Sequence, residues 1–209
     1  MAAEREGPVS RETSLAALRE VLPHLDDAAT ARLDAFEVLL ADTAVPRGYV
    51  AAGDAARLFD RHVADSARAA VAINPKDRRA LDAGSGAGLP GIPVAIVRPD
   101  VEVVLTEPRA GRVAFLELAV ERLDLRNVRI LPWRVEDLVD ERFDVVMARA
   151  FAPPEAAWRR LAPLLEPGGR IVYFAGRSRT SLDPPPGSRW RVLEASVLAT
   201  WGPLIIMTR

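Results

Sequence analysis

The chain has 209 residues, of which 49% are hydrophobic and 27% charged, and its formal net charge is −1. Such a chain can bury a hydrophobic core, and its near-neutral charge excludes an evenly basic surface for nucleic acid, although a local basic patch stays open. It contains no cysteine and two histidines, which excludes disulfides and cysteine nucleophiles and argues against a metal site.

The first part of the chain has the pattern of helices. Its polar start and the lack of an apolar run of membrane length lead us to expect a cytoplasmic protein that does not associate with a membrane. We also expect a monomer that holds no metal. Apolar residues at helical spacing predict helices, which cover residues 14–22, 26–44 and 54–73. Asp26 is the expected N-cap of the second, and proline and glycine interrupt the pattern over 45–53. We therefore predict an N-terminal helical subdomain over residues 1–75.

From residue 79 onward, predicted strands alternate with predicted helices. The strands cover residues 79–83, 102–107, 128–133, 143–150 and 169–175. The first of these helices ends near Val97, and the other three cover residues 109–124, 135–140 and 154–165. The turn EPGG precedes the fifth strand. Two last strands, 190–198 and 202–209, are joined by a short loop, which allows antiparallel pairing but no crossover helix. The pattern predicts an α/β, Rossmann-like domain over 76–209, with a doubly wound sheet and a C-terminal antiparallel strand.

A glycine-rich turn follows the first predicted strand, in the stretch LDAGSGAGLPGIP. Gly84, Gly86 and Gly88 form G-x-G-x-G directly after Asp82, and Glu107 ends the next strand. In open α/β sheets the ligand lies beyond the carboxyl ends of the strands, at such a turn. An acidic residue about 20 positions further on can accept both hydroxyls of a ribose. The sequence therefore predicts a site for a nucleoside-bearing cofactor.

Two classes of cofactor fit this turn. Residues 86–91 spell the G-x-G-x-x-G of a dinucleotide site, but that register begins too far beyond the strand. Counted from the end of the strand, the spacing is typical of S-adenosylmethionine enzymes, and Asp82 suits an ammonium group and repels a pyrophosphate. The closing antiparallel strands favour the same enzymes. We predict a class I S-adenosylmethionine-dependent methyltransferase, with the cofactor at Asp82, Gly84, Ser85, Gly86, Gly88 and Glu107.

Over residues 57–176 the chain resembles the bacterial glucose-inhibited division protein B family, through RHVADS, GLPGIP, RVEDL and RAF. Members of that family methylate N7 of a guanine in small-subunit ribosomal RNA. The resemblance implies S-adenosylmethionine as cofactor and 16S ribosomal RNA, in the small subunit or its precursor, as partner. It implies a cofactor site lined by Gly84, Leu89, Val135, Glu136 and Arg149. It also implies that the RNA or the reacting site is faced by Arg112, Arg134 and Arg149.

The residue types that are missing fit that reaction. Guanine N7 carries an in-plane lone pair, so its methylation requires alignment rather than prior deprotonation. Methylation at C5 of a pyrimidine would normally require a cysteine, and the chain has none. Methylation of an exocyclic amine would suggest an Asn/Asp-Pro-Pro-aromatic run after the fourth strand, where the sequence reads ARAFAPP. We accordingly interpret His62 as a packed or capping residue rather than a base.

The chain departs from the family's pattern at three places. The usual Asn-Leu-Thr sequence is replaced within residues 45–59, a lysine beside Arg112 is Gly111, and a lysine near the fifth strand is Ala175. Arg177 or Arg179 is a candidate replacement as a phosphate contact. Because lost cations weaken RNA binding, two alternatives stay open. They are a methyltransferase of a small molecule or protein, and a non-catalytic scaffold that binds S-adenosylmethionine.

Overall fold

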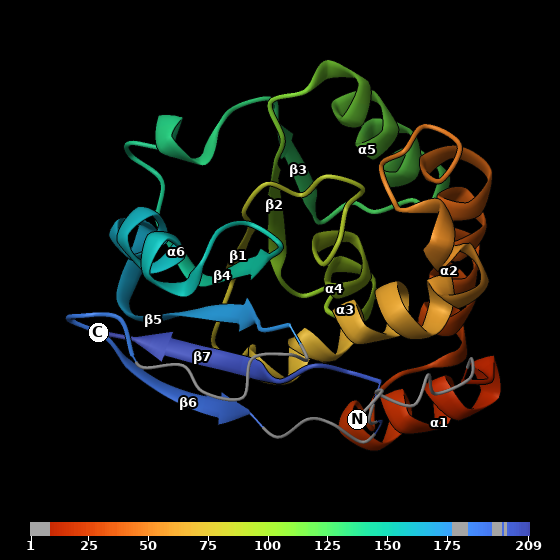
Figure 1. Cartoon of the computed structure of the whole chain (residues 1–209), viewed down its shortest axis with the longest axis horizontal. Coiled ribbons are helices and arrows are strands. Elements are labelled where there is room, and N and C mark those ends of the chain that lie inside the picture. Colours follow the sequence, from red (N-terminus) through yellow and green to blue (C-terminus); the bar gives the residue numbers. More distant parts are fainter. Residues whose placement is uncertain (1–8, 177–183, 194–197, 199) are drawn as a thin grey trace, which may run out of the picture.

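Among the residues that the computed structural model describes, seven strands form one sheet, in the order β3-β2-β1-β4-β5-β7-β6 (Figure 1). The structure describes residues 9–176, 184–193, 198 and 200–209. The strands are β1 Arg79–Asp82, β2 Glu102–Thr106, β3 Val128–Leu131, β4 Phe143–Arg149, β5 Leu165–Phe174, β6 Arg189–Leu193 and β7 Leu204–Thr208. The first five pair in parallel, whereas β7 is antiparallel to both β5 and β6. This arrangement confirms the predicted doubly wound sheet and its antiparallel end.

The fifth strand differs from its prediction. The turn expected at residues 166–169 lies inside β5, because β5 pairs with β4 on both sides of it. Phe143 pairs with Leu165 but Val145 pairs with Arg170, so β5 carries extra residues between these two pairs. Gly168, with φ of +82°, lets the main chain of β5 bend at this irregularity, in a conformation that residues with a side chain rarely adopt. The predicted strand 190–198 is described as β6 up to Leu193, and residues 194–197 lie outside the described part.

Helical elements make up the described N-terminal part, as predicted. The first two are α1 (Arg11–Val21) and α2 (Asp27–Leu39). Asp26 caps α2, because its Oδ1 accepts a hydrogen bond from Ala29 N at 2.7 Å. Shorter turns of 3₁₀, π and α type follow: η1 Leu40–Ala44, η2 Ala52–Arg57, η3 Phe59–Ala64, α3 Asp65–Ala67 and η4 Arg68–Ala72. The predicted helix 54–73 is therefore a series of short, differently wound segments.

The helices between the strands are also close to their predicted positions. They are α4 Gly91–Val97, α5 Ala110–Arg122, η5 Val135–Asp137, α6 Pro154–Leu161 and η6 Ala162–Leu164. The predicted helix 135–140 is a single 3₁₀ turn, and the predicted helix 154–165 ends at Leu161. Pro163 cannot donate a main-chain hydrogen bond, which fits the change from α6 to the 3₁₀ turn η6.

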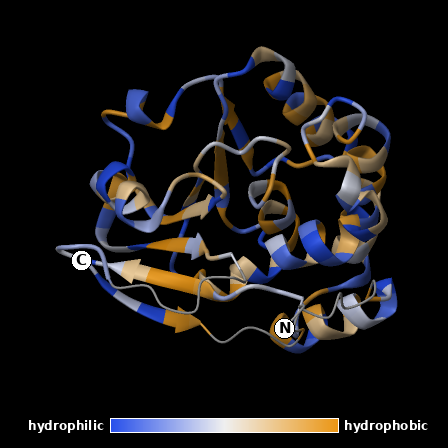
Figure 2. Ribbon diagram, in the orientation of Figure 1, coloured by the Kyte–Doolittle hydropathy of each residue, from blue (hydrophilic) through white to orange (hydrophobic). Residues whose placement is uncertain are grey.

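Side chains from alternate positions of each strand pack on opposite faces of the sheet. Val103 and Leu105 of β2 belong to the core under α1 to α5, whereas Val104 packs with α6 on the other face. Figure 1 shows α6 on one side of the sheet and the N-terminal helices on the other, and Figure 2 shows the strands as mainly hydrophobic. The N-terminal helices share one core with the sheet, and the boundary between residues 75 and 76 stays a prediction.

Gly91, the first residue of α4, lies too close to the sheet for a side chain. A Cβ there would lie 2.2 Å from Leu105 Cδ2 and 2.7 Å from Asp82 Oδ2. Gly91→Ala is expected to lower the free energy of unfolding by about 1–3 kcal/mol, measured by urea unfolding, because the core must shift to admit the methyl group. Gly53→Ala is the control, since its Cβ would meet nothing within 4 Å. Equal stabilities of the two variants would contradict this packing.

Candidate functional site

The glycine turn after β1 is held in a conformation that requires glycine. Gly84, Gly86 and Gly88 have φ of +72°, +60° and +80°, in the left-handed region that L side chains rarely adopt. Thr106, at the end of β2, fixes the turn: its Oγ1 accepts from Gly84 N at 3.1 Å and its carbonyl accepts from Ser85 N at 2.8 Å. The turn therefore brings bare main chain to the carboxyl edge of the sheet.

Asp82 lies beneath this turn rather than in a cavity. Its side chain is buried, and Oδ2 accepts a hydrogen bond from Gly91 N at 2.9 Å, which satisfies an amide at the start of α4. Burial raises the pKa of the Asp82 carboxyl to about 7, although the bond from Gly91 opposes that shift. The expected contact of Asp82 with an ammonium group stays a prediction.

Glu107 connects the glycine turn to the start of α5. Its carboxyl is buried, Oε2 accepts from Gly86 N at 3.2 Å and Oε1 accepts from Arg109 N at 2.9 Å. The guanidinium of Arg112 lies 3.6 Å from Oε2. The acidic group at the end of β2 is thus in place beside the turn, as the sequence predicts, and it also orients the turn.

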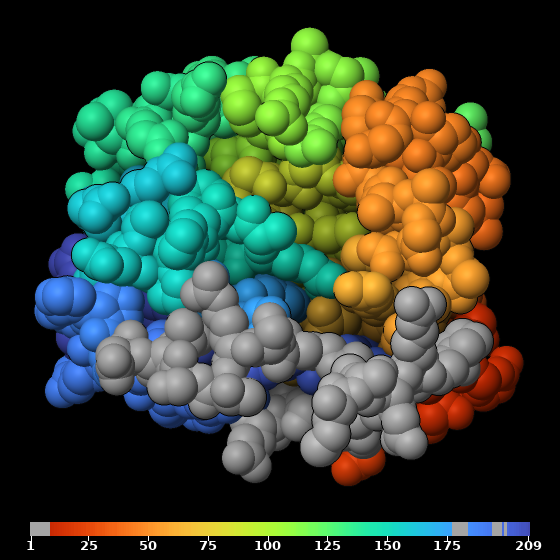
Figure 3. Space-filling model, viewed as in Figure 1, coloured from red at the N-terminus to blue at the C-terminus, as the bar shows by residue number. Residues whose placement is uncertain are grey.

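A cavity of about 300 Å³ lies over the glycine turn. In Figure 3 this turn, coloured olive, lies in a hollow between the N-terminal segment in orange and the segment after β4 in teal. We call this space the loop cavity. Its lining includes six predicted site residues, namely Gly84, Ser85, Gly86, Leu89, Arg112 and Arg149. The other lining residues, none of which was predicted as a site residue, are Tyr49, Val50, Ala51, His62, Ala87 and Ala150.

Tyr49 and Arg112 pack together at this loop cavity. The Arg112 guanidinium lies 5.6 Å from the centre of the Tyr49 ring, which also packs edge-on against Phe115. A Cβ at Gly111 would lie 2.8 Å from the hydroxyl oxygen of Tyr49. Two departures from the family's pattern therefore meet here, because the missing side chain at 111 leaves room for the tyrosine that precedes η2.

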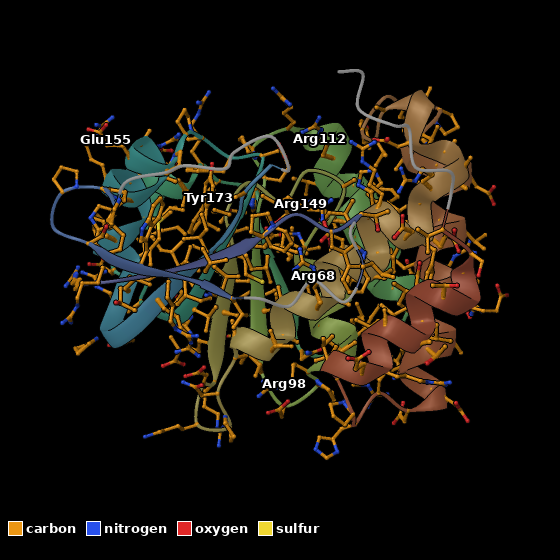
Figure 4. The ribbon with its side chains drawn as sticks, turned by 60° about the horizontal axis from the view of Figure 1, so that its bottom comes forward. Arg68, Arg98, Arg112, Arg149, Glu155 and Tyr173 are labelled. Atoms are coloured by element: carbon orange, nitrogen blue, oxygen red, sulfur yellow. The ribbon has the colours of Figure 1, made fainter. Side chains whose placement is uncertain are left out.

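Arg149, the last residue of β4, links the sheet to the N-terminal helices. Its Nη1 lies 3.0 Å from Asp65 Oδ2 and 2.9 Å from Ser66 Oγ, and its Nη2 donates to the carbonyl of Arg61 at 2.8 Å. Figure 4 shows Arg149 between Arg112 and Arg68. Two hydrogen bonds and one ion pair to one helical segment hold the guanidinium in a fixed place at the loop cavity.

A second cavity, of about 410 Å³, adjoins the loop cavity and shares His62, Arg149 and Ala150 with it. It lies at the carboxyl ends of β4 and β5, and we call it the side cavity. His62 Nε2 lies 3.1 Å from Asp54 Oδ2, and burial followed by the charge of Arg149 lowers the pKa of the imidazole. The lowered pKa favours the uncharged imidazole, and the interpretation of His62 as a packed or capping residue stays a prediction.

Like Asp82 and Glu107, four further predicted site residues do not line either cavity: Gly88, Arg134, Val135 and Glu136. Glu136 is paired with Arg160, whose guanidinium lies 4.4 Å from the centre of the Phe151 ring. That ring in turn lies beside Gly84. The cofactor and RNA roles of these four residues stay predictions. Ala175 lines the side cavity, whereas Arg177 and Arg179 lie outside the described residues.

In the part of the chain that the structure describes, no group of three or more histidine, cysteine or acidic side chains could hold a metal ion. Nor does any helix of that part have the length and apolar character needed to span a membrane.

Comparison with protein families and curated sequences gives consistent matches. The family model described as rRNA small subunit methyltransferase G matches residues 29–181. Ribosomal RNA small subunit methyltransferase G of Mycobacterium leprae (strain TN) is 45% identical over 143 residues, 66% of this chain and 57% of that protein. The protein of that name from Salinispora arenicola is 44% identical over 158 residues, 70% of this chain and 65% of that protein. The matches thus span less than two thirds of these relatives' length.

Comparison with solved structures shows the fold. A mutant of MtNAS in complex with S-adenosylmethionine has a TM-score of 0.57 at 16% identity, covering 94% of this chain and 71% of that one. A ribosomal protein L11 methylase from Lactobacillus delbrueckii subsp. bulgaricus has a TM-score of 0.56 at 13% identity, covering 72% of this chain and 79% of that one. These likenesses confirm the predicted fold class.

The buried Asp82 predicts a pH-dependent stability. Because its folded-state pKa of about 7 lies above the ordinary 3.8, the unfolded chain loses this proton first as pH rises. The free energy of unfolding then falls between about pH 4 and pH 7, by up to about 4 kcal/mol for this one group. Asp82→Asn keeps an acceptor for Gly91 N and does not titrate. Its stability relative to the wild type is expected to increase over that range, measured by urea unfolding.

Asp100→Asn is the control for this measurement. The pKa of Asp100 is lowered below its ordinary 3.8, mainly by its hydrogen bond from Arg98, so this group titrates below the pH range in which Asp82 is tested. The stability of Asp100→Asn relative to the wild type is therefore expected to stay nearly constant between about pH 4 and pH 7. If the stability difference between Asp82→Asn and the wild type did not change between about pH 4 and pH 7, the Asp82 carboxyl would already be ionised in the folded chain over that range.

Proposed function

Because the chain belongs to the rRNA small subunit methyltransferase G family, we propose that it transfers a methyl group from S-adenosylmethionine to N7 of a guanine in 16S ribosomal RNA. The observation that carries the proposal is the pair of adjoining cavities at the carboxyl edge of the sheet, with Arg149 at both. The small ribosomal subunit or its precursor is the proposed substrate particle, and the cytoplasm the proposed compartment, with the chain acting as a monomer.

The loop cavity suits the cofactor. Its glycine turn presents main chain without side chains, and a Cβ on Gly86 would extend toward the Arg112 guanidinium, 3.6 Å away, and reduce the space. Glu107 lies beside the turn, where its carboxylate can accept ribose hydroxyls. Tyr49 supplies an aromatic surface from the N-terminal segment. Bound there, S-adenosylmethionine would supply a methyl group carried on a positively charged sulfur, with a neutral thioether as the leaving group.

The protein's part in such a reaction is alignment. Guanine N7 attacks with its own lone pair, so no side chain has to remove a proton, and His62 is not required as a base. Arg149 is fixed by Asp65, Ser66 and Arg61, at the one place where both cavities meet. It can therefore hold the acceptor against the cofactor site without moving. Such positioning accounts for a large part of the rate in two-substrate reactions.

Replacement of Arg149 tests this role. Arg149→Ala is expected to lower methyl transfer from labelled S-adenosylmethionine to unmodified small subunits by about 100-fold, because misplacement of about 1 Å has that effect. Calorimetry is expected to show that the variant still binds S-adenosylmethionine, since the glycine turn is intact. The matched control is Arg126→Ala, whose side chain is 88% exposed and lies outside both cavities.

The same assay decides between the proposed activity and its alternatives. The product must be 7-methylguanosine in the small-subunit RNA, identified by mass spectrometry of its nucleosides. Transfer to a metabolite or protein extract but not to small subunits would favour the small-molecule or protein methyltransferase. Binding of S-adenosylmethionine without transfer to any of these acceptors would favour the scaffold.

A further inference from the structure

Trp133 lies exposed at the carboxyl edge of the sheet, two residues beyond β3. It is 46% exposed, whereas Trp158 and Trp201 are buried and Trp190 is half-buried. Tryptophan is a large residue that is highly buried on average in folded proteins. Exposed aromatic rings are common where a protein binds a partner, because one rigid ring covers a large area at a small cost in conformational entropy. The ring of Trp133 is therefore accessible to a partner from solvent.

The register of the sheet places Trp133 near the loop cavity. Thr106 of β2 pairs with Leu131 of β3, and Glu107 N donates to the carbonyl of Leu131 at 3.2 Å. Glu107 in turn accepts a hydrogen bond from Gly86 N of the glycine turn. Two residues of chain span at most about 7 Å, so Trp133 stays within that distance of Leu131. The segments that follow β2 and β3 leave the sheet at the same edge (Figure 1), and Trp133 is thus a neighbour of the functional site.

Three arginines accompany the ring along this edge. Arg134 follows Trp133 directly and is also exposed. Arg109 is exposed at the start of α5, where Arg112 N donates to its carbonyl at 2.9 Å, so the two side chains lie one turn apart on the helix. Arg112 lines the loop cavity, whereas in the described part of the chain neither Arg109 nor Arg134 forms an ion pair. Cations therefore continue from the exposed ring toward the loop cavity.

The carboxylates of this edge are already bound by groups of the protein itself. Glu107 accepts hydrogen bonds from two main-chain amides. Glu136 is paired with Arg160, and Asp137 Oδ2 accepts from the main-chain N of Arg134 at 3.0 Å. The two arginines without an ion pair are thus left to bind an anion from solvent. A phosphate group matches the forked donors of a guanidinium.

A ring between such arginines favours single-stranded nucleic acid over a protein surface. Unpaired bases expose flat faces that stack on aromatic side chains, and the phosphates that join them bind arginine. The bases of a duplex stack on one another and offer no free face. A protein interface usually has a wider apolar centre, whereas the exposed residues beside this ring are Pro108, Arg109, Pro132 and Arg134.

We propose that Trp133 stacks on an unpaired base of the RNA substrate, while Arg109 and Arg134 bind the phosphates next to that base. This inference rests on the proposed function, which brings an RNA strand to this edge of the sheet. The stacked base flanks the methylated one, because Trp133 lies outside both cavities. Stacking tolerates any base, so Trp133 holds the strand in place and does not select its sequence. Trp133 is therefore a positioning residue for the proposed reaction.

Binding of a short RNA tests the proposal, with S-adenosylhomocysteine bound to the full chain. The probe is a fluorescent single strand of about ten nucleotides without internal pairing, compared by anisotropy with a duplex of the same length. Trp133→Ala is expected to bind the single strand roughly 5- to 150-fold more weakly, because it loses one stacked base, and to bind the duplex as the wild type does. Trp133→Phe keeps an aromatic ring and is expected to retain most of the affinity.

The salt dependence of binding separates the ring from the arginines. For a single strand, each lost phosphate contact reduces the slope of log affinity against log salt concentration by about 0.7. Arg109→Ala is expected to show that reduction, whereas Trp133→Ala is expected to keep the slope of the wild type at its lower affinity. The matched controls are Arg126→Ala, whose side chain is 88% exposed, and Val192→Ala, 57% exposed on β6 at the other end of the sheet. Both must bind the single strand as the wild type does.

Four outcomes overturn the proposal. Unchanged affinity of Trp133→Ala for the single strand would leave the ring to a protein partner. Loss of S-adenosylhomocysteine binding in that variant, measured by calorimetry, would place the ring on the cofactor. The others are an equal loss of single strand and duplex, and no binding of the single strand by the wild type.

Methyl transfer to small subunits is read separately from RNA binding. Binding that depends on Trp133 without any transfer would remove the proposed reaction and leave the stacking site. Transfer by the wild type, with Trp133→Ala equal to it in both transfer and RNA affinity, would leave the reaction and remove the role of Trp133.

Discussion

One buried carboxylate, that of Asp65, connects the two parts of the chain at the functional edge of the sheet. It pairs with Arg149 from β4 and with Arg68 from the helical segment that follows it. Removal of one partner of a buried ion pair typically destabilises a protein by several kcal/mol, and Asp65 is the carboxylate that both arginines share. The place where both cavities meet depends on the pairing, and so does the close approach of the N-terminal helices to the glycine turn.

Much of the fold could be predicted from the sequence because its signals are local. Alternation of strands and helices, the cap at Asp26 and the glycine spacing each act over a few residues, and the structure confirms them. The turn before β5 is different. Its residues have turn chemistry, yet β5 pairs with β4 on both sides of them, and that pairing depends on a strand distant in the sequence. The winding of residues 52–72 into several kinds of helix is likewise decided by packing.

The site was predictable only where it lies on the glycine motif or on the motifs of the resemblance. The structure brings together at the loop cavity six of the predicted residues: Gly84, Ser85, Gly86, Leu89, Arg112 and Arg149. Tyr49 and Arg68 carry no local signal, because a tyrosine between helices and an arginine in a helix are ordinary surface residues in most sequences. Their burial and orientation follow from how the N-terminal helices pack on the sheet. Asp82 was recognisable as a key acid, but its burial beneath the turn was not.

The contact between Tyr49 and position 111 has a consequence for how such chains diverge. With glycine at 111 the tyrosine hydroxyl occupies the volume that any longer side chain would need. A lysine at 111 would require the tyrosine hydroxyl to shift, since its Cβ alone would lie 2.8 Å from that oxygen. The two positions therefore constrain each other across more than sixty intervening residues, because a side chain added at 111 requires the tyrosine to shift.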